Sequence, residues 1–495
     1  MNLEREVKLT VGPLFHLPDL SEVLDGFSAE GEGVQRFVTS YNDTQDLRLA
    51  RWGCSLRYRT GDGWTVKLPA TVLSDTLARE EHQFEAGPGR PPAPAIDLLR
   101  GYLRQEPVSL AVRLQTVRRT TRLLDAEAKP AAEVVDDEVS VLDGRRVVAR
   151  FRELEAELTQ DADEAIIDPV IKRLVAEGAQ RAEPALPKYV RALMPLAAEP
   201  PEVEQTGKRP KTVEAMIRTA LSASVVRLIR HDAAVRIGSD VEGVHQARVA
   251  TRRLRSDLRT FRTLLEPTWD AQLRDELRWL GDELGAVRDL DVLGERLRAH
   301  ASMLPDDDAV TMRKLLDRLR AQRDEARAAM LSAMREDRYA VLLDRLVSAA
   351  KAPAVLDEVA STPAVDVIDS LVSGPWDHLQ HACESLDPGS ADADLHAARI
   401  RAKRVRYAAE AVAPVVGKPA RRFAERAAAL QDELGEHQDS VVAAGWLRDQ
   451  AAGTSARVAF TAGELGAIEA RLQRRARRRW PDAWAALDRK KLRFW

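Results

Sequence analysis

The sequence predicts an α+β protein of two domains, an antiparallel barrel of seven or eight strands followed by an all-α domain. With 495 residues the chain is too long for a single hydrophobic core. Its composition changes near residue 200, from short alternating segments between Gly, Pro and Asp turns to long segments rich in Ala, Leu, Arg and Glu. The second half also contains an internal repeat, which predicts duplicated helical bundles.

The first half is predicted to form the barrel. Apolar and polar residues alternate with the period of a strand in residues 3–11, 35–41, 54–60, 64–68, 115–124, 132–141 and 147–158. Gly61-Asp62-Gly63 and Asp143-Gly144 have the composition of hairpin turns, because Gly accepts positive φ and Asp bonds its own backbone. Residues 96–104 and 162–176 are predicted helices. So many strands with so few helices favour a closed or nearly closed antiparallel barrel.

The second half is predicted to be helical and duplicated. Residues 195–211 are rich in Pro and Glu and lack an apolar period, which is typical of a linker. We therefore place the first domain at residues 1–195, the linker at 196–211 and the helical domain at 212–495. The segment VHQARVATRRLR at 244–255 recurs as LHAARIRAKRVR at 395–406, and Asp-Glu-Leu-Gly occurs at 282–285 and 432–435. The repeat predicts two similar bundles, about 212–350 and 364–495, related by a pseudo-two-fold axis.

Composition excludes several classes of protein. No run of about 18 apolar residues could span a bilayer, and the acidic N-terminus does not resemble a signal peptide, so we expect no membrane association. Two cysteines without metal-site or disulfide spacing are typical of a reducing cytoplasm. The net charge of −3 conceals local excesses of arginine, so it excludes no anionic ligand. Nothing in the sequence predicts the oligomeric state.

Charged residues occupy one face of the predicted strands. Residues i, i+2 and i+4 of a strand share a face, so Glu4, Glu6 and Lys8 project together. The same alternation recurs in Arg57 and Arg59, Arg79 and Glu81, Arg118 and Arg122, Glu133 and Asp137, and Glu153, Glu155 and Glu157, with Lys67 as one more cation. Directed outward, these charges form a solvated surface. Directed inward, they line a tunnel whose carboxylates hold a hard divalent cation and whose Arg and Lys bind phosphate oxygens. Five strands with this pattern favour the tunnel.

The first ~190 residues resemble the CYTH, or triphosphate tunnel metalloenzyme, family. The resemblance rests on Glu4-x-Glu6-x-Lys8, the segment 41–49 (YNDTQDLRL), Arg57-x-Arg59, Lys67, Arg79-x-Glu81, Thr116-x-Arg118, Glu133 with Asp137, Glu153-x-Glu155 and Lys188-Tyr189-x-Arg191. It implies an eight-stranded tunnel that cleaves a triphosphate with Mg²⁺ or Mn²⁺.

The CYTH resemblance also implies roles for individual residues. The implied metal ligands are Glu4, Glu6, Asp137, Glu153 and Glu155. The implied phosphate-binding residues are Lys8, Arg57, Arg59, Lys67, Arg79 and Arg118. Glu4, Glu6 and Lys8 would be catalytic, with Lys8 helping to activate the attacking water.

The repeated helices each carry a basic stripe. At about 100° per residue, His245, Arg248, Arg252 and Arg255 fall on one side of a helix, and His396, Arg399, Lys403 and Arg406 repeat them. Like charges at this spacing repel, so an anion or neighbouring carboxylates must balance them. The alternatives are pairing with the shared acids Asp289 and Asp439, or a solvated face.

Residues of roughly 210–490 resemble the CHAD domain, through the two His-x-x-Arg-x-x-x-(Arg/Lys)-Arg-x-Arg helices and the two Asp-Glu-Leu-Gly segments. The resemblance implies two four-helix bundles with a basic groove that binds inorganic polyphosphate. The implied binding residues are His245, Arg248, Arg252, Arg253, Arg255, His396, Arg399, Lys403, Arg404 and Arg406. One His per helix without nearby acids or thiols makes a poor metal site, so the histidines favour phosphate hydrogen bonding.

Together the two resemblances predict a cytoplasmic inorganic triphosphatase that binds polyphosphate and is found at polyphosphate granules. Hydrolysis of thiamine or nucleoside triphosphates, cyclisation of ATP, and a non-catalytic polyphosphate-binding protein are the alternatives. Nucleic-acid binding is disfavoured, because the arginine helices lack interleaved aromatic residues for base stacking.

Overall fold

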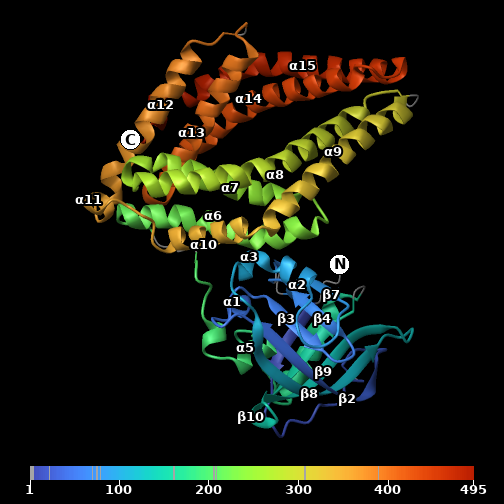
Figure 1. Cartoon of the computed structure of the whole chain (residues 1–495). Helices are drawn as coiled ribbons and strands as arrows, with labels where there is room; N and C mark the ends of the chain where they lie inside the picture. Colours follow the sequence, from blue (N-terminus) through green and yellow to red (C-terminus); the bar gives the residue numbers. More distant parts are fainter. Residues whose placement is uncertain are drawn as a thin grey trace. The chain divides into compact units, whose positions relative to one another are not determined.

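The computed structural model of the chain divides into two compact units, Met1–Pro201 and Glu202–Trp495 (Figure 1). The structure describes all residues except 1–4, 22, 70, 74–75, 79, 160–161, 205–206, 208, 306–307 and 388. The predicted site residues Glu4 and Arg79, and the side chain of Glu6, therefore lie outside the described part of the chain. Each unit has its own arrangement of elements and is treated separately.

The first unit contains one antiparallel sheet, which confirms the predicted fold class. Its strands are β1 (Arg5–Thr10), β2 (Ser28–Asp43), β3 (Ser55–Arg59), β4 (Gly63–Lys67), β5 (Thr71–Leu73), β6 (Thr76–Ala78), β7 (Glu81–Phe84), β8 (Ser109–Leu124), β9 (Pro130–Asp143), β10 (Arg146–Leu158) and β11 (Gln180–Arg181). Their order is β5-β6-β1-β10-β9-β8-β2-β3-β4-β7, and β11 pairs with β1. All seven predicted segments are strands. The sheet has eleven strands in the described part of the chain because four more are too short for alternation to show in the sequence.

The sheet curls back toward itself without recorded pairing between its two edges in the described residues. Ala78 ends β6 near one edge, and Glu81 begins β7 at the other edge. Three peptide steps separate these residues, so their Cα atoms lie within about 11 Å of each other. The polypeptide itself therefore holds the two edges close together.

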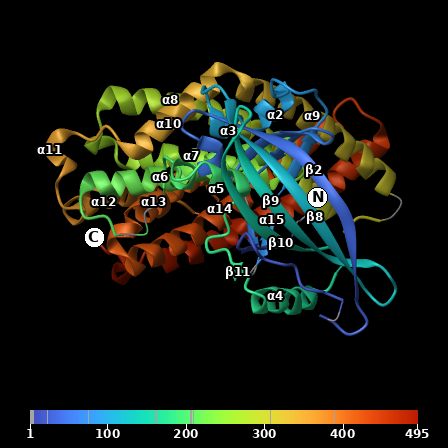
Figure 2. The same cartoon turned by 90° about the horizontal axis from the view of Figure 1, so that it is seen from below.

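Strand β10 shows why charged residues face the inside of this curled sheet. Leu154 and Ala156 are buried in an apolar cluster with Val170 and Leu174 of helix α4 (Ile167–Ala176). Glu153 and Glu155 alternate with them and therefore face the other side of the sheet, where they are also buried. One face of the strand is thus covered by apolar packing, and the buried carboxylates lie on the other face. The long strands β2, β8, β9 and β10 run beside one another in the curved sheet (Figure 2).

The second unit is helical. Its main helices are α6 (Val213–Ile237), α7 (Glu242–Thr260), α8 (Pro267–Ala301), α9 (Ala309–Arg335), α10 (Asp337–Lys351), α11 (Asp357–Ala360), α12 (Ile368–Glu384), α13 (Asp392–Val416), α14 (Lys418–Ala451) and α15 (Ala456–Leu487). Helices α8 and α9 form one long hairpin, and α14 and α15 form another (Figure 1). None of the described helices is long and apolar enough to cross a membrane.

The duplication is visible in the backbone. A shift of 151 residues carries His245 to His396 and carries α6–α9 onto α12–α15. The N–H of Val213 donates to the carbonyl of Thr362 (3.0 Å), and the N–H of Ala364 donates to the carbonyl of Lys211 (2.9 Å). The same shift exchanges these two hydrogen bonds. The two copies are therefore related by a pseudo-two-fold axis that passes near this contact.

Candidate functional site

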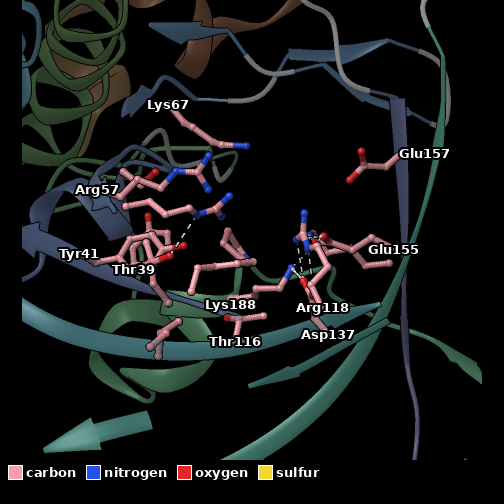
Figure 3. Close-up of a pocket in the computed structure, with 17 residues that line it drawn as sticks. Thr39, Tyr41, Arg57, Lys67, Thr116, Arg118, Asp137, Glu155, Glu157 and Lys188 are labelled. Carbon is pink, nitrogen blue, oxygen red and sulfur yellow. Dashed lines mark hydrogen bonds and ion pairs between the residues drawn. The ribbon is translucent and has the colours of Figure 1, made fainter. Parts of the chain in front are cut away.

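A polar cavity of about 220 Å³ lies inside the curled sheet of the first unit (Figure 3). It is lined by Lys8, Phe37, Thr39, Tyr41, Ser55, Arg57, Arg59, Lys67, Leu114, Thr116, Arg118, Asp137, Glu155, Glu157, Pro187, Lys188 and Tyr189. Five of the predicted phosphate-binding cations and two of the predicted carboxylates are among these residues. The structure thus brings side chains from seven strands, β1–β4 and β8–β10, to one internal space.

One wall of the cavity carries buried carboxylates. In the register of the sheet, Arg118 of β8 is directly opposite Asp137 of β9, and Asp137 is opposite Glu153 of β10. Residues paired in this way share a face, so the three side chains form a row across the sheet. Asp137 is 0 % exposed and Glu153 is 2 % exposed. Lys8 of β1 is opposite Glu155 in the same register, and the two form an ion pair.

Lys188 holds these carboxylates together. It is the first residue of the short helix α5 (Lys188–Ala192), and its Nζ lies 2.8 Å from Glu155, 3.0 Å from Asp137 and 3.1 Å from Glu153. Arg191, one turn later on the same face of α5, donates to Glu153 at 3.1 Å. Figure 3 shows Lys188 and Arg118 converging on the same acids.

The carboxylate wall is balanced electrostatically. Burial would raise the pKa of Glu155, but Lys188 and Lys8 hold the pKa of Glu155 well below its usual range. Burial likewise opposes the charge of Lys188, but Glu155, Asp137 and Glu153 raise the pKa of Lys188 well above its usual range. Both groups are therefore ionised at neutral pH. Neighbouring charges outweigh desolvation at this wall.

The opposite wall carries an excess of cations. Arg57 and Arg59 project from β3, and Lys67 projects from β4 beside Glu81, with which it forms an ion pair. Arg57 lies 3.9 Å from the same carboxylate. Burial together with Arg57 and Arg118 lowers the pKa of Arg59. This lowering marks positive potential that the protein leaves incompletely neutralised, which favours an anionic ligand in the cavity.

The buried carboxylates of the first wall are also predicted ligands of a metal ion. In the described part of the chain, no three His, Cys, Asp or Glu side chains are grouped to hold a metal. The predicted ligands Asp137, Glu153 and Glu155 instead surround the ammonium of Lys188, because three close carboxylates repel unless a cation separates them. Their oxygens are nevertheless the donors that Mg²⁺ and Mn²⁺ prefer. The donor set thus fits such a cation in kind, in competition with Lys188 and Lys8.

The basic residues of the helical unit fall into two groups. The first group is paired internally. Arg248 lies 2.9 Å from Asp289, Arg399 lies 3.9 Å from Asp439, and His396 shares a hydrogen bond of 2.8 Å with Gln438. Arg253 bonds Asp257 and Glu410, and Arg406 bonds Glu410.

The second group of basic residues faces a cavity of about 580 Å³ in the helical unit. Arg252, Arg255, Lys403 and Arg404 all line it. Burial, together with the nearby Arg399 and Arg252, lowers the pKa of Lys403 to about 8. His245 does not line this cavity, and burial together with Arg288 lowers its pKa. The predicted stripe is therefore partly neutralised by the protein and partly directed into an open basic cavity.

Comparison with known proteins identifies both units. The CYTH domain family matches residues 2–175, and the CHAD domain family matches residues 219–448. The chain belongs to the CYTH–CHAD proteins. The uncharacterized protein Rv2226 of Mycobacterium tuberculosis H37Rv is 31% identical over 511 residues, which cover 99% of this chain and 97% of that protein. An uncharacterized protein of the CDC 1551 strain is 31% identical over the same length.

Two solved structures are also similar to parts of the chain. PptA from Streptomyces chartreusis has a TM-score of 0.47 at 25% identity, and the match covers 56% of this chain and 99% of that chain. The CHAD domain from the plant Ricinus communis has a TM-score of 0.48 at 29% identity, and the match covers 58% of this chain and 95% of that chain.

Several residues of the CYTH cavity were not assigned a role from the sequence. Lys188 and Arg191 belong to the motif that carried the resemblance, but their spacing alone does not show that they reach three acids on other strands. The guanidinium carbon of Arg59 lies over the ring of Phe37, 4.1 Å from the ring centroid. Glu157, which lines the cavity, lies in β10 opposite Glu6 of β1. Each of these relationships depends on the register of the sheet.

Proposed function

We propose that the CYTH domain hydrolyses inorganic triphosphate with Mg²⁺ or Mn²⁺, and that the CHAD domain binds inorganic polyphosphate. One observation carries the first part of the proposal: a single cavity is lined by six Arg and Lys side chains together with carboxylates of β9 and β10. CYTH proteins are triphosphate tunnel enzymes that depend on a metal, and this cavity has the polarity that such chemistry requires.

The cations supply the binding of the substrate. Arg57, Arg59, Lys67 and Arg118 face a common space, so they can contact successive phosphoryl groups of one short chain. In hydrolysis, a water oxygen bonds to the terminal phosphorus while the bridging P–O bond breaks, which yields phosphate and pyrophosphate. Positive charge around the leaving pyrophosphate stabilises the charge that develops on it.

The carboxylates supply the site for the metal. Glu153 and Glu155, with Glu4, Glu6 and Asp137 as further ligands predicted from the family motif, would hold Mg²⁺ or Mn²⁺, which would neutralise phosphate charge and polarise the terminal phosphoryl group. The low pKa of Glu155 keeps its carboxylate charged, so Glu155 is suited to binding a cation and not to accepting a proton. Lys8, bonded to Glu155, is held beside the same space.

The aromatic residues of the cavity favour an inorganic substrate. Tyr41 and Tyr189 stack on each other with centroids 4.8 Å apart, and Arg59 covers Phe37. Their faces are thus engaged by the protein and offer little platform for a nucleobase or a thiazolium ring. A triphosphate without an organic group needs no such platform.

The proposal is tested by phosphate release from tripolyphosphate, ATP and thiamine triphosphate, with Mg²⁺, Mn²⁺ or EDTA. We expect metal-dependent turnover that is fastest with tripolyphosphate, and loss of about 10²-fold or more in kcat/KM for Arg118→Gln and Glu6→Gln. Arg119→Gln is the matched control, because Arg119 pairs with Glu138 on the outer face of the same strand. Absence of turnover on all three substrates would leave a polyphosphate-binding protein without triphosphatase activity.

The second part of the proposal is supported by the basic cavity of the CHAD domain. Arg252, Arg255, Lys403 and Arg404 line one concave space from two different helices. We expect inorganic polyphosphate to bind the full-length protein more tightly than duplex DNA of equal phosphate content. Equal displacement of bound polyphosphate by DNA and by unlabelled polyphosphate would contradict this preference.

A further inference from the structure

The duplication of the CHAD domain has produced two copies of one cavity. The larger, of about 580 Å³, lies among α7, α8, α12 and α13, and the smaller, of about 350 Å³, lies among α6, α7 and α13. All thirteen residues that line the smaller cavity have a counterpart 151 residues away that lines the larger one. Examples are Thr219 with Ser370 and Arg227 with His378. The cavities are therefore equivalent by pseudo-symmetry, and their differences in charge can be compared position by position.

The smaller cavity contains its own anion. The carboxylate of Glu410 on α13 accepts a hydrogen bond from Arg406 Nε (2.7 Å) and also bonds Arg253 Nη1 of α7. Arg253 additionally donates from Nε to the buried Asp257 (3.1 Å). Two arginines from different helices are thus bridged by one carboxylate group. Charge-assisted pairs of this kind satisfy both guanidinium groups without an external ligand.

The larger cavity lacks both of these acids. The counterpart of Glu410 is Arg259, and the counterpart of Asp257 is Ala408. Arg404 and Arg255, the counterparts of Arg253 and Arg406, have no recorded carboxylate partner in the described part of the chain. Eight Arg and Lys side chains, and no Asp or Glu, are among the residues that line this cavity.

The cations that line the larger cavity lie close enough to one another to interact. Burial, together with Arg404, Arg274, Arg255 and Arg278, lowers the pKa of Arg259. Arg274 and Arg278 pair with acids of their own helix, Asp270 at 2.8 Å and Asp275 at 3.1 Å, so they are partly neutralised. Among the described residues, no acid pairs in this way with Arg255, Arg259 or Arg404. An oxyanion between them would relieve their mutual repulsion.

We propose that the larger cavity is a dedicated phosphoryl-binding pocket, in which Arg255 and Arg404 hold one phosphoryl group of polyphosphate as Arg406 and Arg253 hold the carboxylate of Glu410 in the smaller cavity. This inference rests on the proposed polyphosphate binding and adds to it the cavity in which the chain is anchored. Although the basic helices are duplicated, only one of the two equivalent cavities is open to an external anion. A polyphosphate chain is therefore anchored on the α8–α12 side of the axis, and the α6 side is closed by Glu410.

The test compares variants at equivalent positions of the two cavities. Arg255→Gln in the larger cavity and Arg406→Gln, at the equivalent position of the smaller cavity, each remove one positive charge, so both reduce nonspecific attraction of a polyanion to a similar extent. Binding of medium-chain inorganic polyphosphate is measured with the full-length protein in EDTA, in an Arg118→Gln background that weakens binding in the CYTH cavity. We expect Arg404→Gln and Arg255→Gln to weaken binding by at least about tenfold, and Arg406→Gln by no more than about threefold.

The possible outcomes distinguish the one-sided pocket from polyphosphate binding itself. Equal losses for Arg255→Gln and Arg406→Gln would overturn the one-sided pocket and leave polyphosphate binding intact. Absence of polyphosphate binding by the protein without CHAD substitutions would overturn the proposed function itself. Displacement of the chain by orthophosphate at equal phosphoryl concentration would assign the pocket to free phosphate and overturn its role in anchoring a chain. Thermal unfolding of each variant shows whether a loss comes from misfolding.

A gain of binding provides a second, independent test. Glu410→Gln removes the internal anion and leaves Arg253 and Arg406 available in the smaller cavity. We expect pyrophosphate, added in EDTA in the Arg118→Gln background, to bind this variant with one more equivalent than the protein with Glu410 intact. An unchanged stoichiometry would overturn the inference that the Glu410 carboxylate occupies the place of a phosphoryl group.

Discussion

Arg118 and Asp137 form a two-point ion pair inside the CYTH cavity, with Arg118 Nε 2.9 Å from one carboxylate oxygen and Nη2 2.7 Å from the other. Asp137 is completely buried, and Lys188 reaches the same carboxylate from α5. Both oxygens of Asp137 are thus engaged by cations of the protein. This arrangement favours Asp137 as the residue that positions Arg118 and Lys188, alongside the metal-binding role predicted for it.

Asp137→Asn should destabilise the CYTH domain as well as slow its reaction. Removal of the buried charge takes away the two-point partner of Arg118 and one of the three carboxylates around Lys188, which typically costs about 3 kcal/mol or more in the free energy of unfolding. Urea unfolding, with hydrogen exchange of β8 and β9 as the local measurement, checks the prediction. Glu138→Gln, which changes an exposed acid on the adjacent position of β9, is the control and should cost less than about 0.5 kcal/mol. Equal effects of the two substitutions would contradict the structural role.

Lys188→Gln should separate metal binding from turnover. Without the ammonium, Glu153, Glu155 and Asp137 keep their negative charge with fewer compensating cations, so Mn²⁺ should bind several-fold more tightly. Phosphate release from tripolyphosphate should nevertheless fall by at least about tenfold, because the carboxylates lose their common partner and their positions. Mn²⁺ binding by electron paramagnetic resonance and steady-state kinetics measure the two effects. Lys172→Gln, on the exposed face of α4, is the control, and weaker Mn²⁺ binding in Lys188→Gln would refute the prediction.

Polyphosphate binding should weaken as the pH rises above about 8. Burial, with Arg399, Arg252 and Arg248, lowers the pKa of Lys403 to about 8, and only Asp439 among its charged neighbours opposes this. Lys403 therefore loses its charge at a lower pH than an ordinary lysine, and the anion loses a cationic partner. Affinities at pH 7 and pH 9.5 measure the effect, which should be much smaller in Lys403→Arg because Arg stays charged. Parallel losses in both proteins would assign the pH dependence to another group.

The lowered pKa of Lys403 also predicts how the free energy of unfolding depends on pH. The unfolded chain keeps the Lys403 proton up to the ordinary pKa of 10.5, whereas the folded chain releases it near pH 8. The unfolded state therefore binds more protons between these values, so the contribution of Lys403 to the free energy of unfolding rises with pH across this window. The difference between the original protein and Lys403→Arg, measured by urea unfolding at pH 7.5 and pH 10, isolates this contribution. If this difference in the free energy of unfolding were the same at both pH values, the folded protein would not lower the pKa of Lys403, which would contradict the prediction.

Chelation should distinguish the two domains. The CYTH cavity combines carboxylates with cations, whereas the lining of the larger CHAD cavity contains no Asp or Glu. EDTA should therefore abolish phosphate release from tripolyphosphate and leave the dissociation constant for long-chain polyphosphate within about twofold. Phosphate assay and fluorescence anisotropy provide the two measurements. Loss of polyphosphate binding in EDTA would show that a metal contributes to the CHAD site.

Much of the CYTH site could be predicted because strands impose a period of two. Lys8, Arg57, Arg59, Lys67, Arg118, Asp137 and Glu155 were all expected to face one interior, and all of them line the same cavity. Glu153 is buried on the same wall. The short strands β5, β6, β7 and β11 were not predicted, because two to four residues are too few to show alternation. Lys188 received no role, because a single lysine in a five-residue helix has no pattern that indicates its partners.

The sequence by itself determined the two fold types and the duplication of the CHAD domain, because hydrophobic period and self-similarity are local properties of the chain. Which of the repeated charges pair with an acid of the protein depends on the tertiary structure. His245, Arg248, Arg252 and Arg255 repeat as His396, Arg399, Lys403 and Arg406, yet Arg406 is bonded to Glu410 whereas its counterpart Arg255 faces the larger cavity. The reason is that neutralisation of a charge depends on the packing of α7 against α13, and side chains about 150 residues apart meet only in the folded protein.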